Sequence, residues 1–228
     1  MNTTTLNPQT TSLSPGTSIQ QQVNESISNL LASLPDPEKL SAEQRRGIIA
    51  RYTSVLEGNF IYWMTGAYLS VRSEEARSII LDNLHEEVRD SHPAMLRRFA
   101  LAAHAAPTDS DALAVYRDLT NVRLFVGRLS TVPLVITMAF FEGFIQKFMS
   151  FFAGIAVAQG SKEMEYTDVH GVCDVAHTAG LFRALDAEIA LNSSDSDNNL
   201  FEGVQLLRKL IERIVTPDMV SNGTHATA

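Results

Sequence analysis

The segment between Tyr166 and Leu181 carries side chains of metal-binding type at a helical spacing. His170, Asp174 and His177 lie at positions i, i+4 and i+7. On an α-helix these three side chains stack along one face, about one turn apart. Two imidazoles and a carboxylate in this register can hold a transition metal. The alternative is a solvated polar stripe, because the valines and alanines around it do not mark either face as the more deeply buried one.

A single carboxylate interrupts the most apolar part of the chain. Glu142 lies within residues 131–158, where almost every other side chain is apolar. A helix that is apolar on all sides belongs in a protein core or a membrane, and Glu142, Gln146 and Lys147 in mid-segment would be costly in a bilayer. We therefore expect a buried central helix. A carboxylate there must be paired, protonated or bound to a metal, and pairing with Gln146 or Lys147 is the alternative to a metal.

A third cluster of acidic residues and histidines ends at a proline. Glu86, Glu87 and His92 lie in the segment that leads to Pro93. Proline lacks a backbone donor and disfavours a helical residue before it, so the helix should kink or unwind near residues 89–92. Such a break could bring Glu86 and His92, which do not share a face on an ideal helix, to one point. The alternative is an exposed, charged helix.

Four further residues are weaker candidates. Glu57 shares a helix face with Phe60, so its side chain is expected to point inward. It could then bind a metal, accept a hydrogen bond from a ligating histidine or pair with a neighbouring aromatic side chain. An amino-acid substrate would need a fixed donor for its carboxylate, and the planar guanidinium group suits that role. Arg72, Arg89 and Arg123 are the candidates, because each lies on or near a helix expected to carry a ligand.

These residues must be positioned by helices, because the sequence shows no strand pattern of useful length and no internal repeat. Apolar side chains recur at helical spacing through the middle of the chain, and Ser41-Ala-Glu-Gln44 has the form of a capping box. We predict a single all-α bundle of about seven helices. The predicted helices cover residues 19–34, 41–71, 73–104, 109–129, 130–158, 161–191 and 200–215, with a loop at 193–199.

Composition narrows the classes of function. The 228 residues carry a formal net charge of −8 and have a pI near 5.2, which argues against nucleic-acid binding because that needs a basic patch. The one cysteine, Cys173, excludes an intramolecular disulfide and suits a reducing compartment. It lies about 100° around the helix from Asp174, so we expect it to pack rather than to bind metal.

The two ends of the chain differ from its middle. Residues 1–18 and 216–228 are polar and are predicted to be disordered tails. The first tail has neither the basic nor the apolar region of a signal peptide. We therefore expect one helical domain over residues 19–215, in a cytoplasmic protein that does not bind membranes.

Set in order, the polar residues of these helices resemble a known ligand pattern. The pattern is that of the haem-oxygenase-like di-metal oxidases, within the TENA/PqqC-like fold superfamily, and it is most similar to the CADD-like proteins. The resemblance covers roughly residues 51–191. It rests on His-x3-Asp-x2-His, on the lone glutamate about thirty residues earlier in an apolar helix, and on Asn-Leu-x-Glu-Glu followed by His-Pro.

The resemblance implies a seven-helix fold that contains no haem and holds two irons. The implied ligands are Glu86, His92, Glu142, His170, Asp174 and His177, with Glu87 as the alternative to Glu86 and Glu57 as an additional candidate. Two Fe(II) ions per chain, with manganese as the alternative metal, would use O2 to oxidise a small molecule. Members act on amino acids and fatty acids, and we expect an amino acid or a derivative of one here. An external reductant and a second copy of the chain are further partners that would suit this function.

Three other functions compete with this one. A ferritin-like di-iron protein would leave His92 and His170 without a role; its ligands would be Glu57, Asp82, His85, Glu142, Asp174 and His177. A metal-free TENA-like hydrolase or cofactor-free oxidase would need a cysteine or an acid pair at the site, and Cys173 is misdirected for nucleophilic attack. A non-enzymatic interaction module is suggested only by the tails.

Overall fold

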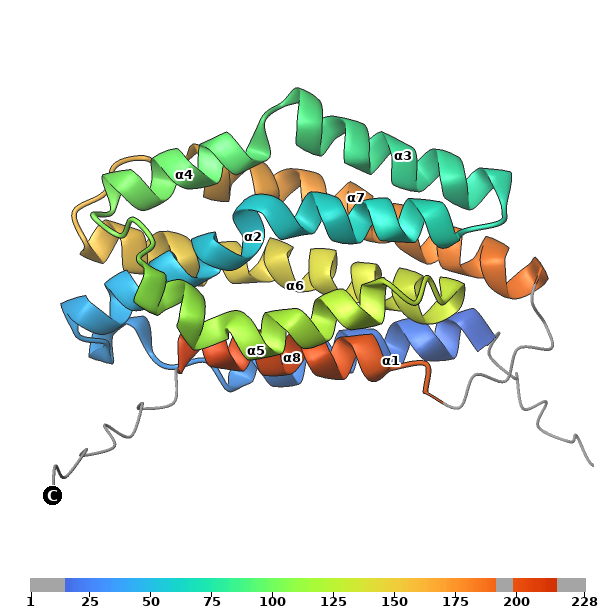
Figure 1. Ribbon diagram of the computed structural model, residues 1–228, viewed down its shortest axis with the longest axis horizontal. Helices are drawn as coiled ribbons and strands as arrows, with labels where there is room; N and C mark the ends of the chain where they lie inside the picture. The colour runs from blue at the N-terminus through green and yellow to red at the C-terminus, as the bar shows by residue number, and fades with distance from the viewer. Residues whose placement is uncertain (1–14, 192–198, 217–228) are drawn as a thin grey trace, which may run out of the picture.

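The computed structural model describes residues 15–191 and 199–216 of the chain. Within these ranges it has eight α-helices, one short 3-10 helix, η1 (Pro37–Lys39), and no strand. The α-helices are α1 (Pro15–Ala32), α2 (Ala42–Ser70), α3 (Glu74–Arg89), α4 (His92–Ala102), α5 (Asp109–Val126), α6 (Thr131–Ala158), α7 (Glu165–Leu191) and α8 (Glu202–Val215). They form an elongated bundle and run roughly along its long axis (Figure 1). The prediction of an all-α fold is confirmed.

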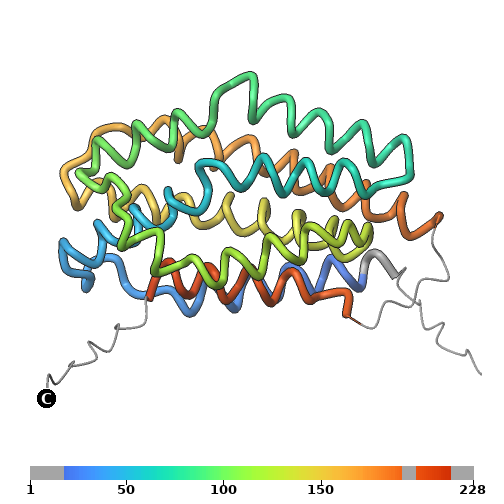
Figure 2. Tube along the Cα trace, in the orientation of Figure 1, coloured from blue at the N-terminus to red at the C-terminus, as the bar shows by residue number. Residues whose placement is uncertain are grey.

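Helix α6 runs through the middle of the bundle (Figure 2). It packs against α1, α2, α7 and α8. Among the described helices it is the one that is long and apolar enough to cross a membrane, but 83% of its most apolar stretch is buried inside the bundle. A helix with apolar side chains on every face suits such a surrounded position. The expected buried central helix is therefore confirmed.

The chain breaks between α3 and α4, where one kinked helix was predicted. Asp90 ends α3, Ser91 adopts a left-handed conformation with φ of 57°, and His92 begins α4. Pro93 occupies the first turn of α4, where its missing N–H leaves no hydrogen bond unmade. The break falls within the predicted range of residues 89–92, but it is complete. The described chain therefore has eight helices instead of the expected seven or so.

Other helix boundaries follow local sequence signals. The predicted capping box is present: Gln44 N–H donates to Ser41 Oγ (3.2 Å), and Ser41 N–H donates to the Gln44 side chain (2.8 Å). Helix α1 begins at Pro15, so it includes residues 15–18 of the predicted first tail. The rest of that tail, most of the loop at 193–199 and residues 217–228 lie outside the described residues.

A buried carboxylate holds the start of α3 against α7. Glu188 is fully buried, and its Oε1 accepts hydrogen bonds from the N–H groups of Arg72 (2.8 Å) and Ser73 (2.6 Å). Ser73 in turn caps α3 by accepting from Ala76 N–H. With its start fixed near the end of α7, α3 runs back along α7. This arrangement brings the acidic end of α3 opposite the His170–His177 part of α7.

Candidate metal centre

Helices α3, α4, α6 and α7 bring seven polar side chains together inside the bundle. Three are histidines and four are carboxylates. Six of the seven are buried: Glu87, His92, Glu142, His170, Asp174 and His177. The seventh, Glu86, has a side chain that is 40% exposed. They form two adjoining groups, and α7 contributes His170 to the first and Asp174 and His177 to the second.

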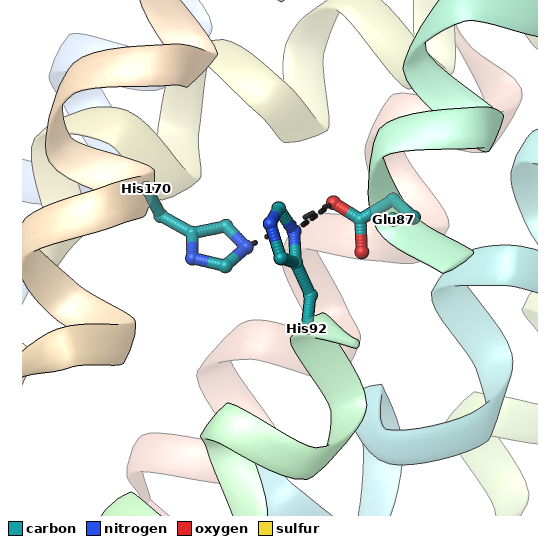
Figure 3. Close-up of side chains that lie close together, drawn as sticks. All are labelled: Glu87, His92 and His170. Carbon is teal, nitrogen blue, oxygen red and sulfur yellow. Dashed lines mark hydrogen bonds and ion pairs between the residues drawn. The ribbon is translucent and has the colours of Figure 1, made fainter. Parts of the chain in front are cut away.

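The first group contains Glu87, His92 and His170, one residue from each of three helices (Figure 3). Glu87 Oε1 lies 2.7 Å from His92 Nδ1 and 3.9 Å from His170 Nε2. On the other side of its ring, His170 Nδ1 lies 2.8 Å from the carbonyl oxygen of Tyr166. A donor proton on Nδ1 satisfies that bond and leaves the lone pair of His170 Nε2 facing Glu87 and His92.

The second group contains Glu142, Asp174 and His177. His177 Nδ1 lies 3.8 Å from both Glu142 Oε1 and Asp174 Oδ1, which is beyond hydrogen-bond distance. The opposite ring atom, His177 Nε2, lies 2.9 Å from Glu86 Oε2. Cys173 Sγ lies 3.2 Å from Asp174 Oδ1 and donates to it. Glu86 thus holds the outer side of the His177 ring, and Asp174 Oδ1 faces both the Cys173 thiol and His177 Nδ1.

Burial dominates the electrostatics of both groups. Burial, reinforced by the charge of Glu142, raises the pKa of Asp174 to about 9. Burial also raises the pKa of Glu142, and it lowers the pKa of His170 to about 4. For His177, burial favours the neutral ring, but nearby Glu142 and Glu86 outweigh it and raise the pKa to about 9. Without a metal, Glu142 and Asp174 therefore favour their protonated forms, because the neighbouring groups do not offset the charge of both carboxylates.

The site opens into a cavity that we call the metal-site cavity. Five of the six buried polar residues line it, together with apolar side chains of α2, α4 and α6. Two tyrosines also line it, and the hydroxyl groups of Tyr52 and Tyr166 lie 3.0 Å apart. Neither tyrosine was among the predicted site residues. Tyr166 could have been found, because it lies four residues before His170 and so shares its helix face.

Comparison with known proteins identifies the family. A sequence model of the family Haem_oxygenas_2, described as an iron-containing redox enzyme, matches residues 49–210. The chain belongs to this family of iron-containing redox enzymes. The match extends from α2 to α8, covers more than half of the chain and includes every residue of both groups. No curated protein matches the chain. The expected relationship is therefore confirmed at the level of the family, and membership of the CADD-like subgroup stays a prediction.

The residues of this iron-containing redox enzyme fit a metal. Three buried atoms of the second group have no hydrogen-bond partner in the described chain: Glu142 Oε1, Asp174 Oδ2 and His177 Nδ1. An unsatisfied buried polar atom costs about 1–3 kcal/mol, so three in one place indicate an interaction that protein groups do not supply. Imidazole nitrogen and carboxylate oxygen are ligands that iron accepts. The pairing of Glu142 with Lys147 is not seen, because the Lys147 side chain is exposed and Glu142 Oε1 remains unpaired.

The positions of the two adjacent glutamates of α3 do not agree with the predicted preference for Glu86 as the metal ligand. Glu87 is buried between the histidines of the first group, whereas Glu86 lies at the outer edge beside His177. The complete helix break explains the difference. It lets α4 turn so that His92 meets Glu87, a rotation that helical periodicity alone does not fix.

The weaker candidates do not join the site. Glu57 forms an ion pair with Arg97 at the surface instead of pointing inward. Arg89 pairs with its neighbour Asp90 on the exposed end of α3, and Arg123 donates to Asn59 (2.7 Å). None of the three proposed arginines, including Arg72, lines the metal-site cavity. The ferritin-like ligand set also fails to assemble, because Asp82 and His85 are exposed on α3.

Proposed function

We propose that this family member is a non-haem di-iron enzyme that uses O2 to oxidise a small molecule. The family supports an iron-dependent oxidoreductase, and the number of irons and the use of O2 are our inference. One observation carries it: two adjoining groups, each with at least one histidine and one carboxylate, are buried, and three ligand atoms of the second group have no hydrogen-bond partner in the described chain. A single ion would leave part of this donor set unused, whereas two ions would use all of it.

In this proposal each group holds one iron. Glu87, His92 and His170 bind the first. Glu142, Asp174 and His177 bind the second, with His177 using Nδ1 because its Nε2 is turned toward Glu86. Glu86 then orients His177 instead of binding metal, as carboxylates commonly do for ligating histidines. We therefore replace the preference for Glu86 as a ligand with Glu87.

The irons, when bound, would supply the centre at which O2 is activated. The chain supplies the surroundings. Leu96, Phe141 and Ile145 line the metal-site cavity and keep bulk water from the reacting species. Burial raises the pKa of Tyr52 and of Tyr166, so both hydroxyl groups stay protonated at neutral pH and can donate hydrogen bonds beside the ligands. The substrate would enter through the same cavity, and an external reductant would restore the ferrous state.

A metal-free hydrolase receives less support. Its nucleophile would be Cys173, but burial and the charge of Asp174 raise the pKa of this thiol well above its usual range. The protonated thiol is a poor nucleophile. Its hydrogen atom is also directed to Asp174 Oδ1, so that attack would have to break an interaction that orders the site.

Titration of the metal-free protein with Fe(II) under anaerobic conditions tests the proposal. The wild-type chain should bind close to two equivalents. Glu87→Gln should bind about one, because it replaces a buried ligand, while the adjacent Glu86→Gln should keep both and bind the second more weakly. Equal stoichiometry in wild type and Glu87→Gln, or loss of an equivalent only in Glu86→Gln, would reject the assignment. O2 consumption by the loaded protein then tests the reaction class.

A further inference from the structure

The one cysteine of the chain lies at the edge of the second group. Cys173 precedes Asp174 on α7, and its Sγ lies 3.2 Å from Asp174 Oδ1. Cys173 Sγ, a carboxylate oxygen of Asp174 and a ring nitrogen of His177 all lie within 4.8 Å of one another. The sulfur is therefore near enough to share an ion with two of the proposed iron ligands, although helical spacing predicts that Cys173 only packs.

The distances within this cluster suit a tetrahedral ion. Zinc binds sulfur at about 2.3 Å and nitrogen or oxygen at about 2.0 Å, so two ligand atoms on one tetrahedral zinc are about 3.3–3.5 Å apart. The separation of Cys173 Sγ and Asp174 Oδ1, 3.2 Å, is close to this value. His177 Nδ1 lies 3.8 Å from Asp174 Oδ1 and 3.8 Å from Glu142 Oε1. Small side-chain shifts would thus bring these atoms onto one ion.

Two of the neighbouring residues point to a ligand independently of the cysteine. Asp174 is fully buried, and its Oδ2 has no hydrogen-bond partner within the described chain. His177 is also buried, and its Nδ1 has no such partner there either. Leaving buried polar atoms unsatisfied is costly, so both atoms are available to an ion that the sulfur can reach.

The sulfur decides which metals can use this cluster. Nitrogen and oxygen ligands suit iron, and beside such an ion the thiol can remain a hydrogen-bond donor to Asp174. Zinc binds thiolate well, so it can replace the thiol proton, which passes to the solvent. The thiolate and the Asp174 carboxylate then balance the two charges of the ion. The first group contains no sulfur and offers zinc no such advantage.

From these features we propose that Cys173, Asp174 and His177 form a binding site for a thiophilic divalent cation such as zinc. Glu142 or a water molecule can take the fourth position. The ion would occupy the place of the second iron, so zinc would displace that iron and inhibit the enzyme. The inhibition rests on the proposed function, because it takes the second group as an iron site, whereas the zinc site itself does not.

Cobalt(II) is the probe for this site. Zinc is spectroscopically silent, whereas cobalt bound to a thiolate absorbs in the near ultraviolet by charge transfer from sulfur to metal. Because Cys173 is the one cysteine of the chain, this band reports a single sulfur. The metal-free full-length protein is titrated with Co(II) under anaerobic conditions. We expect the band to reach the amplitude of one thiolate-bound cobalt per chain and to disappear when excess zinc is added.

Two variants locate the band. Cys173→Ser should abolish it and weaken zinc binding by about tenfold or more, yet keep the Fe(II) stoichiometry of wild type, because serine can still donate to Asp174. His92→Ala is the matched control, because it removes a ligand of the first group and should keep the band at full amplitude. With Fe(II)-loaded protein, excess zinc should release one equivalent of iron from wild type. Cys173→Ser should retain that iron at the same zinc concentration.

The proposal fails if wild type shows no charge-transfer band at saturating cobalt, or if wild type and Cys173→Ser bind zinc equally well. An amplitude of half a cobalt per chain would also overturn it, because the ion would then lie between two chains. Equal release of iron from both proteins would reject the displacement of iron by zinc. A wild-type protein that shows the full band but binds only one Fe(II) would count against the di-iron assignment and not against the zinc site.

Discussion

Replacement of Asp174 by asparagine should stabilise the metal-free protein. Asp174 is fully buried, its Oδ2 has no partner in the described chain, and its pKa is raised to about 9 by burial and by Glu142. The unfolded chain has an ordinary aspartate pKa near 3.9. The folded metal-free protein therefore keeps a proton that the unfolded chain has lost. Asparagine has almost the same shape and needs no such proton.

The sign and size of the effect follow from proton linkage. An acid whose pKa is raised on folding contributes full stability below its unfolded pKa and loses that contribution as the pH rises toward its folded pKa. Between about pH 4 and pH 9, Asp174 should lower the free energy of unfolding by about 1.4 kcal/mol per pH unit. At neutral pH the metal-free Asp174→Asn variant should then be about 2–4 kcal/mol more stable than wild type. The smaller value is expected if the core around the ionised Asp174 side chain relaxes.

Metal should reverse the order of stability. A bound ion stabilises the folded state by mass action, and the variant lacks one proposed ligand. Urea unfolding at several pH values, with chelator and with anaerobic Fe(II), measures both effects. Asp168→Asn is the control, because Asp168 is exposed on the same helix. A metal-free Asp174→Asn protein that is no more stable than wild type at alkaline pH would refute the reasoning, since the carboxylate would then have a compensating partner.

Three further predictions use matched variants. His92→Ala should abolish O2-dependent activity, whereas His85→Ala, which alters an exposed histidine of α3, should leave most of it; the reverse result would support the ferritin-like ligand set. Cys173→Ala should weaken Fe(II) binding because it removes the donor to the neighbouring carboxylate, and Cys173→Ser should restore it; equal affinities in both would show that the thiol only packs. Gly203→Ala should lower the free energy of unfolding by about 1–3 kcal/mol, because the added Cβ would overlap side chains of α5 and α6. Gly154→Ala is the control, because the Cβ added there would extend into open space. Thermal denaturation of the two variants compares their stabilities.

Local spacing predicts only those parts of the site that lie on one helix. His170, Asp174 and His177 share a face of α7 because the helical repeat puts them there, and all three are buried as required. Glu142 could be recognised because a carboxylate in an apolar helix needs a special environment. Both inferences depend only on neighbours in sequence, and for both the structure shows the expected burial.

The contacts between different helices could not be predicted from spacing along the sequence. The choice between Glu86 and Glu87 depends on the left-handed residue Ser91, which sets how α4 turns away from α3. Glu57 shares its helix face with core residues, yet it pairs with Arg97 from α4, a contact between residues distant in sequence. The predicted number of helices and the preference for Glu86 over Glu87 were wrong for the same reason, because both depend on the break between α3 and α4. Periodicity places a side chain on a face, and tertiary contacts decide what that face meets.

Charge balance explains why the site can dispense with an arginine. Within the described chain, Glu87, Glu142 and Asp174 form ion pairs only with histidines. With neutral imidazoles and ionised carboxylates the six proposed ligands carry three negative charges, and two ferrous ions bring four positive ones. The occupied centre would then have one positive charge in excess, in a buried setting where an unpaired charge is costly. Glu86 supplies the missing negative charge, because its Oε2 lies 2.9 Å from Nε2 of the proposed ligand His177. The six proposed ligands and Glu86 together would therefore balance two ferrous ions without a cationic side chain at the site.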